Sequence, residues 1–136
     1  MAVVGLFTAA IEEKGEGIMA LTVYTNDPNA LLNSIRAAIK DKRVETWAYD
    51  VDGDFYHTPE QWRGKAWFRP YVLQGMLSFG LLGQKDVEMT KMIYGIYHGR
   101  FSEMLLVHFD KDFSNVSATA IGDLDADHFK AANRLP

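Results

Sequence analysis

The stretch YGIYHGRFSEMLLVHFDKDF, residues 94–113, decides which fold this chain can adopt. On a helical wheel, at about 100° per residue, most apolar side chains in and before it share one broad side, which predicts an amphipathic helix resting on a core. Asp86 is a suitable capping residue, so we expect the helix to span about residues 86–110. The residues of that apolar side are Met89, Ile93, Ile96, Tyr97, Phe101, Met104 and Val107.

The polar residues of this helix do not form a metal-binding pattern. His98, Glu103 and His108 are five positions apart, so successive side chains point about 140° from each other. A helical zinc pair needs histidines four positions apart on one face. Arg100 and His108 fall within the apolar side and allow two interpretations. Either Arg100 reaches water at the helix edge and His108 bonds a backbone carbonyl, or both line a pocket between helix and sheet.

The opposite side of the helix carries Gly95 and Gly99, bordered by Met92 and Leu106. Two glycines cost a helix about 2 kcal/mol relative to alanine, which calls for a reason. We hypothesise that this side packs against a second copy of the chain through a two-fold interface. The alternative is a helix that kinks at Gly99.

The remaining elements follow from local signals along the chain. Asp27 as N-cap, Pro28 as first helical residue and apolar residues at helical spacing predict a helix over residues 28–42. Strands are expected over residues 20–25, in a hairpin within 44–58 that turns at Asp52-Gly53, over 66–72 and 76–82 with a turn at Gln74-Gly75 between them, and over 115–121. This order predicts an α+β two-layer sandwich, a mainly antiparallel sheet of five or six strands with both helices on one face.

The length of 136 residues suits one domain. The first 18 residues precede the first strand signal and are expected to form an N-terminal extension outside a domain of residues 19–122. Residues 123–136 show no clear period and are expected to be a loose tail.

Composition and charge exclude several classes of function. The net charge is -4 and no cysteine is present, which rules out disulfides and thiolate metal sites. Lysines and arginines are scattered, so no basic face for nucleic acid is expected, and no apolar run approaches the ~20 residues of a membrane span. No basic residue precedes the short apolar segment at the start, so we expect a cytoplasmic protein without a secretory signal. Glycine-rich phosphate loops are missing, so no nucleotide cofactor is expected.

Aromatic residues concentrate between residues 47 and 71, where eight of the seventeen lie, interleaved with His57, Arg63 and Arg69. One interpretation is a cleft for an aromatic or anionic small molecule. The other is ordinary cross-strand packing. With the two polar residues of the long helix, the candidate ligand-binding residues are Trp47, Tyr49, His57, Trp62, Trp67, Arg69, Arg100 and His108.

Asp50, Asp52 and Asp54 alternate in a way that suggests calcium ligands. An EF-hand loop needs glycine at its sixth position and glutamate at its twelfth. Here Gly53 is fourth and Gln61 is twelfth, so we expect a hairpin turn and no calcium site.

The segments YTNDPNALLNSIRAAI, WAYDVDGDFYHTPEQWRGKAW and YGIYHGRFSEMLLVHF resemble a group of short uncharacterised bacterial proteins of the kind carried on mobile gene cassettes. The resemblance covers roughly residues 20–120. It implies a bacterial, cytoplasmic accessory protein. It implies no particular activity and identifies no functional residues.

These patterns favour a non-enzymatic binding module, a homodimer whose ligand is a small organic anion or a protein segment. A first alternative is an acidic protein of the immunity type, which would neutralise a basic toxin or bind another protein partner. A second alternative is a small hydrolase or isomerase that uses His57 or His108.

Overall fold

The structure of the chain, a computed structural model, describes residues 14–121, without the side chains of residues 15–19. Most of the expected N-terminal extension and the expected tail over residues 123–136 lie outside the described residues. Neither described helix combines the length and apolar character that crossing a bilayer requires.

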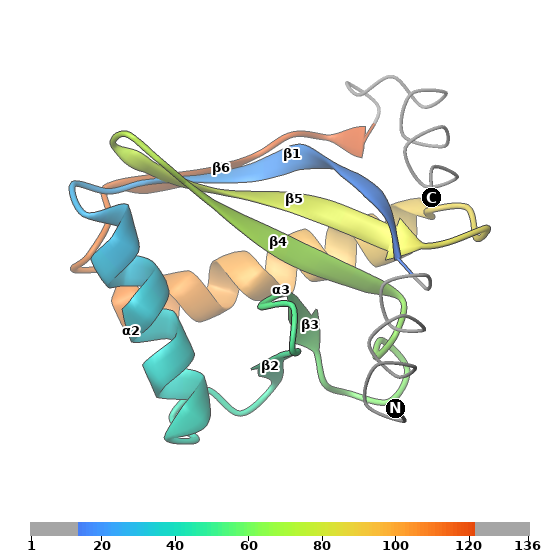
Figure 1. The fold of residues 1–136 in the computed structure, drawn as a ribbon, viewed down its shortest axis with the longest axis horizontal. Coiled ribbons are helices and arrows are strands. Elements are labelled where there is room, and N and C mark those ends of the chain that lie inside the picture. Colours follow the sequence, from blue (N-terminus) through green and yellow to red (C-terminus); the bar gives the residue numbers. More distant parts are fainter. Residues whose placement is uncertain (1–13, 122–136) are drawn as a thin grey trace, which may run out of the picture.

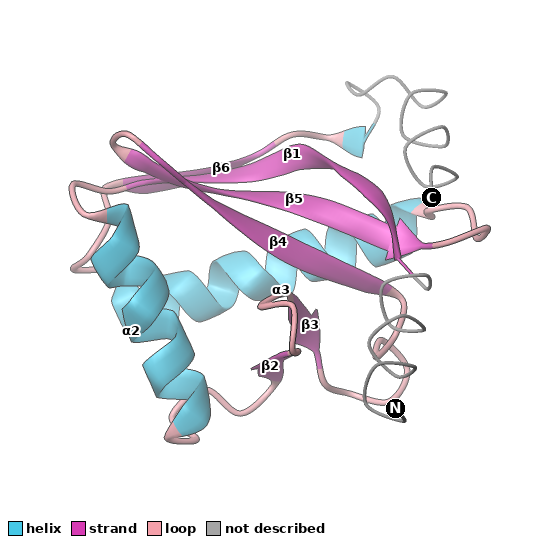
Figure 2. Ribbon diagram, viewed as in Figure 1, coloured by secondary structure: helices cyan, strands magenta, loops and turns pink. Residues whose placement is uncertain are grey.

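Six strands form one antiparallel sheet, and two helices cover one of its faces (Figures 1 and 2). This confirms the predicted α+β sandwich. The strands are ordered β2-β3-β4-β5-β1-β6 across the sheet. Their bounds are β1 Lys14–Tyr24, β2 Trp47–Tyr49, β3 Phe55–His57, β4 Ala66–Leu73, β5 Met76–Gln84 and β6 Asn115–Ala118; the helices are α2 Pro28–Lys40 and α3 Lys91–Phe109.

Strand β1 begins at Lys14 and pairs with β5 from its first residue, opposite Gln84. Residues 14–18, which the sequence placed in an extension, are therefore part of the sheet. The strand was not predicted over these residues because glycine, lysine and glutamate are poor strand formers.

Helix α2 forms for the reasons expected. Asp27 Oδ1 accepts a hydrogen bond of 3.1 Å from the backbone N–H of Ala30, and Pro28 is the first helical residue. The helix ends at Lys40, earlier than predicted, because Lys42 takes a positive φ of 63° and the chain turns back on itself. Its buried side chains are Leu31, Leu32, Ile35 and Ala38.

Helix α3 begins at Lys91, so the predicted start at Asp86 is wrong. Asp86 has a φ of 65° and lies in the turn after β5, a conformation that cannot start a right-handed helix. The cap is Thr90, whose Oγ1 accepts a hydrogen bond of 3.1 Å from the N–H of Ile93.

The buried side of α3 is also rotated relative to the prediction. Val107 was expected in the core and is 67% exposed, whereas His98, which is not among the residues of the predicted apolar side, is buried. Arg100 and His108 are exposed rather than inside the apolar side. The side chains that face the sheet are Tyr94, Tyr97, His98, Phe101, Met104, Leu105 and Phe109.

The core between sheet and helices is built from aromatic rings. The Phe101 ring of α3 lies 4.9 Å from the rings of both Phe68 on β4 and Phe79 on β5. The Trp47 ring on β2 lies 4.8 Å from it, centroid to centroid. Edge-on and tilted contacts of this kind add to the burial of each ring, so α3 holds the short β2–β3 hairpin onto the body of the sheet.

The β2–β3 connection turns through residues 51–53, which lie between the hydrogen-bonded pair Asp50 and Asp54, instead of the predicted two-residue turn. Asp50 and Asp54 are joined by a hydrogen bond from Asp50 N to Asp54 O, and Gly53 has a φ of 83°. This is the hairpin type that ends in a glycine at positive φ. The predicted turn at Gln74-Gly75 does join β4 to β5, with Gly75 at a φ of 72°.

Candidate functional site

A pocket of about 230 Å³ lies between α3 and the β2–β3 hairpin. We call it the His57 pocket. It brings together three of the predicted ligand-binding residues, His57, Arg100 and His108. Its lining residues are Val44, Glu45, Thr46, His57, Arg100, Glu103, Met104, Val107 and His108.

His57 is the buried functional group of this pocket, at 1% exposure. Its Nδ1 lies 2.8 Å from the carbonyl oxygen of Thr46, which can only accept, so Nδ1 carries the proton. The Nε2 atom therefore presents a lone pair, 3.4 Å from an Nη1 of Arg100. The ring stacks on Trp47 with centroids 4.6 Å apart, and these contacts together fix its orientation.

Burial lowers the pKa of His57 below its ordinary value. The guanidinium of Arg100 also lowers the pKa of His57. The hydrogen bond to the Thr46 carbonyl and the carboxylate of Glu103 act in the opposite direction and raise it. The lowered pKa means that the imidazole is neutral at pH 7 and acts as a hydrogen-bond acceptor through Nε2.

The other predicted ligand-binding residues lie elsewhere. Trp47 is buried beneath His57, and Tyr49 and Trp62 pack against the edge of the core. Trp67 and Arg69 alternate with the core residue Phe68 on β4, so they lie on the opposite face of the sheet. The aromatic residues of 47–71 therefore do not form a single wall.

That opposite face carries a charge cluster that sequence reasoning did not find. The ammonium of Lys14 lies 2.6 Å from Asp50, 3.1 Å from Asp52 and 2.8 Å from Asp54. Arg69 donates two hydrogen bonds, of 2.9 and 2.8 Å, to the two oxygens of Asp54. Asp54 is fully buried. We call these five residues the aspartate cluster; it was missed because Lys14 was assigned to the extension.

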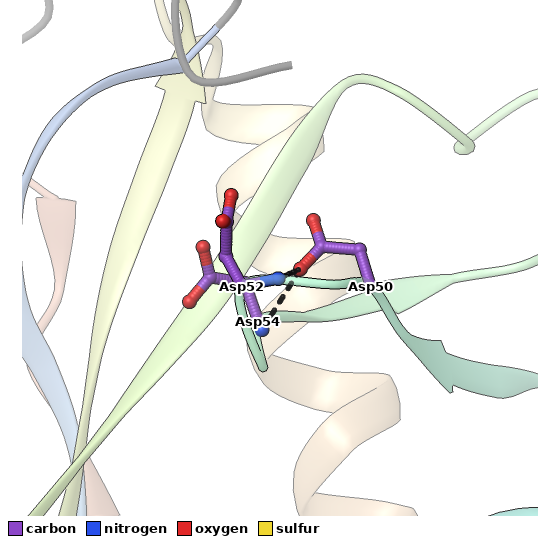
Figure 3. A group of neighbouring side chains, drawn as sticks. All are labelled: Asp50, Asp52 and Asp54. Carbon is purple, nitrogen blue, oxygen red and sulfur yellow. Dashed lines mark hydrogen bonds between the residues drawn. The ribbon is translucent and has the colours of Figure 1, made fainter. Parts of the chain in front are cut away.

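The three aspartates of this cluster are the one group of potential metal ligands in the part of the chain that the structure describes, with ligand oxygens within 4.8 Å of one another (Figure 3). Asp50 Oδ1 accepts from the N–H groups of Asp52 and Asp54, at 3.0 and 3.1 Å, which shapes the loop. The ammonium of Lys14 is within hydrogen-bonding distance of all three side chains and takes the place that a cation would need.

Lys14 keeps its charge in this environment. Burial acts to lower the pKa of Lys14, but hydrogen bonds to Asp50, Asp54 and Asp52 outweigh it and leave that pKa above its ordinary value. The hydrogen bonds to Asp54 likewise raise the pKa of Arg69. Two cations held among three carboxylates make this cluster a structural anchor between β1, β4 and the β2–β3 loop.

His98 is separated from Glu103 and His108, which both line the His57 pocket. It is buried under the sheet, its Nδ1–H donates to the carbonyl of Tyr94 at 2.8 Å, and its ring stacks on Tyr94 with centroids 4.0 Å apart. The Nε2 atom makes no hydrogen bond within the described residues. Burial lowers the pKa of His98 and outweighs the backbone groups of Tyr94 and Ala20, which act to raise it.

The two buried histidines make stability depend on pH. Because His57 and His98 have pKa values below their ordinary 6.5, the folded protein binds fewer protons than the unfolded chain just below that pH. The contribution of these two histidines to the free energy of unfolding is therefore fully present above about pH 6.5. It is lost as the pH is lowered from there through the folded pKa values. Urea unfolding at about pH 7.5 and about pH 5 measures this. Substituting both histidines with glutamine should flatten the dependence, and an unchanged slope would contradict it.

The predicted interface residues share one exposed side of α3. Met92 is 66% and Leu106 is 54% exposed, and a Cβ added at Gly95 or Gly99 meets no atom within 4 Å. We call Met92, Gly95, Gly99 and Leu106 the outer face of α3. No contact within the described residues explains why glycine, which destabilises a helix, stands at these two positions.

A larger groove of about 530 Å³ lies at the end of the sheet where residues 24–27, Gly75 and residues 111–114 meet. Its inner polar groups are already used within the protein: Thr25 Oγ1 donates to the Asp112 carbonyl at 2.7 Å, and Asp27 caps α2. Among the residues that the structure describes, no histidine or arginine lines it. The smaller His57 pocket therefore offers more specific chemistry.

No protein family, curated protein or solved structure matches this chain.

Proposed function

We propose that the chain is a small-molecule binding module that holds a ligand with an anionic group, such as a carboxylate, in the His57 pocket. The observation that carries the proposal is the buried, neutral imidazole of His57, whose Nε2 lone pair meets, among the described residues, only the guanidinium of Arg100 at 3.4 Å. That contact is long and uses one of five guanidinium donors.

Arg100 is suited to binding an anion. Among the described residues it makes no ion pair with a carboxylate, although Glu103 lies one helical turn away. A guanidinium matches the two oxygens of a carboxylate and gains two parallel hydrogen bonds from it. The pocket is smaller than the 300–1,000 Å³ typical of sites for drug-sized ligands, so a ligand with few heavy atoms fits best.

Replacing Arg100 with glutamine should weaken binding of a small carboxylate by about 10- to 150-fold, because hydrogen bonds to charged groups contribute about 1.5–3 kcal/mol. Isothermal titration of the purified protein with a panel of two- to five-carbon acids measures the affinity. Arg63, which lies over the Tyr56 ring away from the pocket, supplies the matched control Arg63→Gln. Equal affinities for the wild type and the Arg100 variant would exclude this pocket.

A second candidate function is catalysis with His57 as a general base. The observation that favours it is the tautomer: Nδ1 donates to the Thr46 carbonyl, so Nε2 is free to accept a proton from a bound molecule. Screening for hydrolase and isomerase activity with the wild type and the His57→Gln variant separates the two functions. An activity that persists in the variant would rule out this role.

We also propose that two copies of the chain associate through the outer face of α3. Exposed Met92 and Leu106 border Gly95 and Gly99, so two helices can approach closely while burying apolar side chains at both ends. The acidic, immunity-type function stays an alternative in which a basic protein occupies such a surface.

Gly99→Ala should convert the dimer to a monomer, because each added methyl group would lie between the two closely packed helices. In the monomer the same change should raise the free energy of unfolding by about 1 kcal/mol, since alanine favours a helix and space is open. Sedimentation equilibrium measures the mass, with Asn33→Ala on the exposed side of α2 as control. A wild type that is monomeric at all concentrations would refute the dimer.

A further inference from the structure

Among the described residues, three formally charged side chains line the His57 pocket: Arg100, Glu45 and Glu103. All three are exposed, and no ion pair joins the arginine to either glutamate in the part of the chain that the structure describes. One positive and two negative charges give the pocket lining a formal charge of about −1. Within the described residues, the pocket therefore presents charges of both signs that form no ion pair.

This charge pattern fits poorly with a ligand of a single charge. A simple carboxylate that reaches Arg100 is repelled by Glu45 and Glu103, and a simple amine that reaches the glutamates is repelled by Arg100. A molecule that carries both charges avoids both penalties, because each of its ends meets the opposite sign.

The hydrogen-bonding groups lead to the same conclusion. Glu45, Glu103 and the Nε2 atom of His57 are three acceptors around one pocket. An ammonium group has three N–H donors and no acceptor, whereas a hydroxyl group offers a single donor. His57 is neutral at pH 7, so it does not repel an ammonium group.

We infer that the ligand of the His57 pocket is a small zwitterion, an α-amino acid with a short aliphatic side chain. Its carboxylate binds Arg100, and its ammonium group donates to His57 Nε2 and to the two glutamates. Val44, Met104 and Val107 supply the apolar part of the lining, and the volume of about 230 Å³ limits the side chain to a few carbons. This inference rests on the proposed function and names its ligand class.

Four matched probes test the inference by isothermal titration: L-alanine, propionate, L-lactate and ethylamine. They have similar size and differ in which charged or donor groups they carry. L-alanine should bind at least about tenfold more tightly than each of the other three, because only it satisfies both signs of charge.

The Glu103→Gln variant provides the second measurement. It should lower the affinity for L-alanine about tenfold and should raise the affinity for propionate, since a repelling charge is gone. The control is Glu60→Gln, an exposed glutamate of the turn before β4 that does not line the pocket. Because Glu103 is exposed, the variant should fold, which circular dichroism checks.

The outcomes separate this inference from the proposed function. If propionate and lactate bind as tightly as alanine, or if Glu103→Gln leaves alanine binding unchanged, the pocket recognises the carboxylate and not the ammonium group, and the inference is overturned. If none of the four probes binds, both the inference and the carboxylate-binding function fail.

Discussion

Replacing Asp54 with asparagine should lower the free energy of unfolding by about 3–5 kcal/mol, the usual cost of removing one partner from a buried charge cluster. Asp54 is fully buried and accepts hydrogen bonds from both Lys14 and Arg69. Without its charge, Arg69 loses the carboxylate that both of its described hydrogen bonds reach. Lys14 stays buried with two partners in place of three.

Chemical denaturation of the variant and the wild type measures the difference. Asp41→Asn is the matched control, because Asp41 pairs with Arg43 at 3.4 Å on the surface, where both side chains are more than half exposed. Such exposed pairs contribute about 0–1 kcal/mol. A loss for the Asp54 variant as small as that of the control would show that Lys14 does not reach the aspartates in the folded protein.

Phe101→Ala should also be strongly destabilising, by about 3–5 kcal/mol, the range for buried phenylalanine truncations. Phe101 is fully buried, and its ring contacts those of Trp47, Phe68 and Phe79 from three different strands. Its removal leaves a cavity at the centre of the core that these rings cannot fill without leaving their own positions.

Val107→Ala is the control that makes this measurement informative. The periodicity of the sequence places Phe101 and Val107 on the same side of the helix, but in the structure Val107 is exposed at the edge of the His57 pocket. Its truncation should change the free energy of unfolding by no more than about 0.5 kcal/mol. A large loss from Val107→Ala together with a small loss from Phe101→Ala would mean that α3 is rotated relative to the structure.

The sequence predicted the element order and the sheet class because the local signals are strong and agree with each other. Asp27 followed by Pro28 marks the start of α2, and Gln74-Gly75 marks the β4–β5 turn, in the way that capping and turn chemistry require. The rotation of α3 was not predictable by the same means. Leu105, Leu106 and Val107 are consecutive, so apolar residues surround the helix and do not single out one face.

The candidate site was predicted residue by residue, but not as an arrangement. His57 and Arg100 were chosen for their chemical types, whereas Glu45 and Glu103 became relevant only when the fold placed them around one pocket. The pocket joins residues of the β2–β3 hairpin region to residues of α3, more than 40 positions later in the chain, and periodicity within one segment carries no information about such proximity. The polar environment of Trp67 was missed for the same reason, because the Lys14 ammonium that lies 5.3 Å from its ring belongs to β1.

The position of Lys14 has a practical consequence for anyone who shortens this protein. A version started at Met19, where the strand signal in the sequence begins, would lack the lysine that lies 40 residues from Asp54 in the chain. Asp50, Asp52 and Asp54 would then crowd together with Arg69 as their only described counter-charge. The repulsion among these carboxylates would then be screened only by ions of the buffer, so the behaviour of such a truncated protein on purification would depend on salt composition in a way that the longer chain avoids.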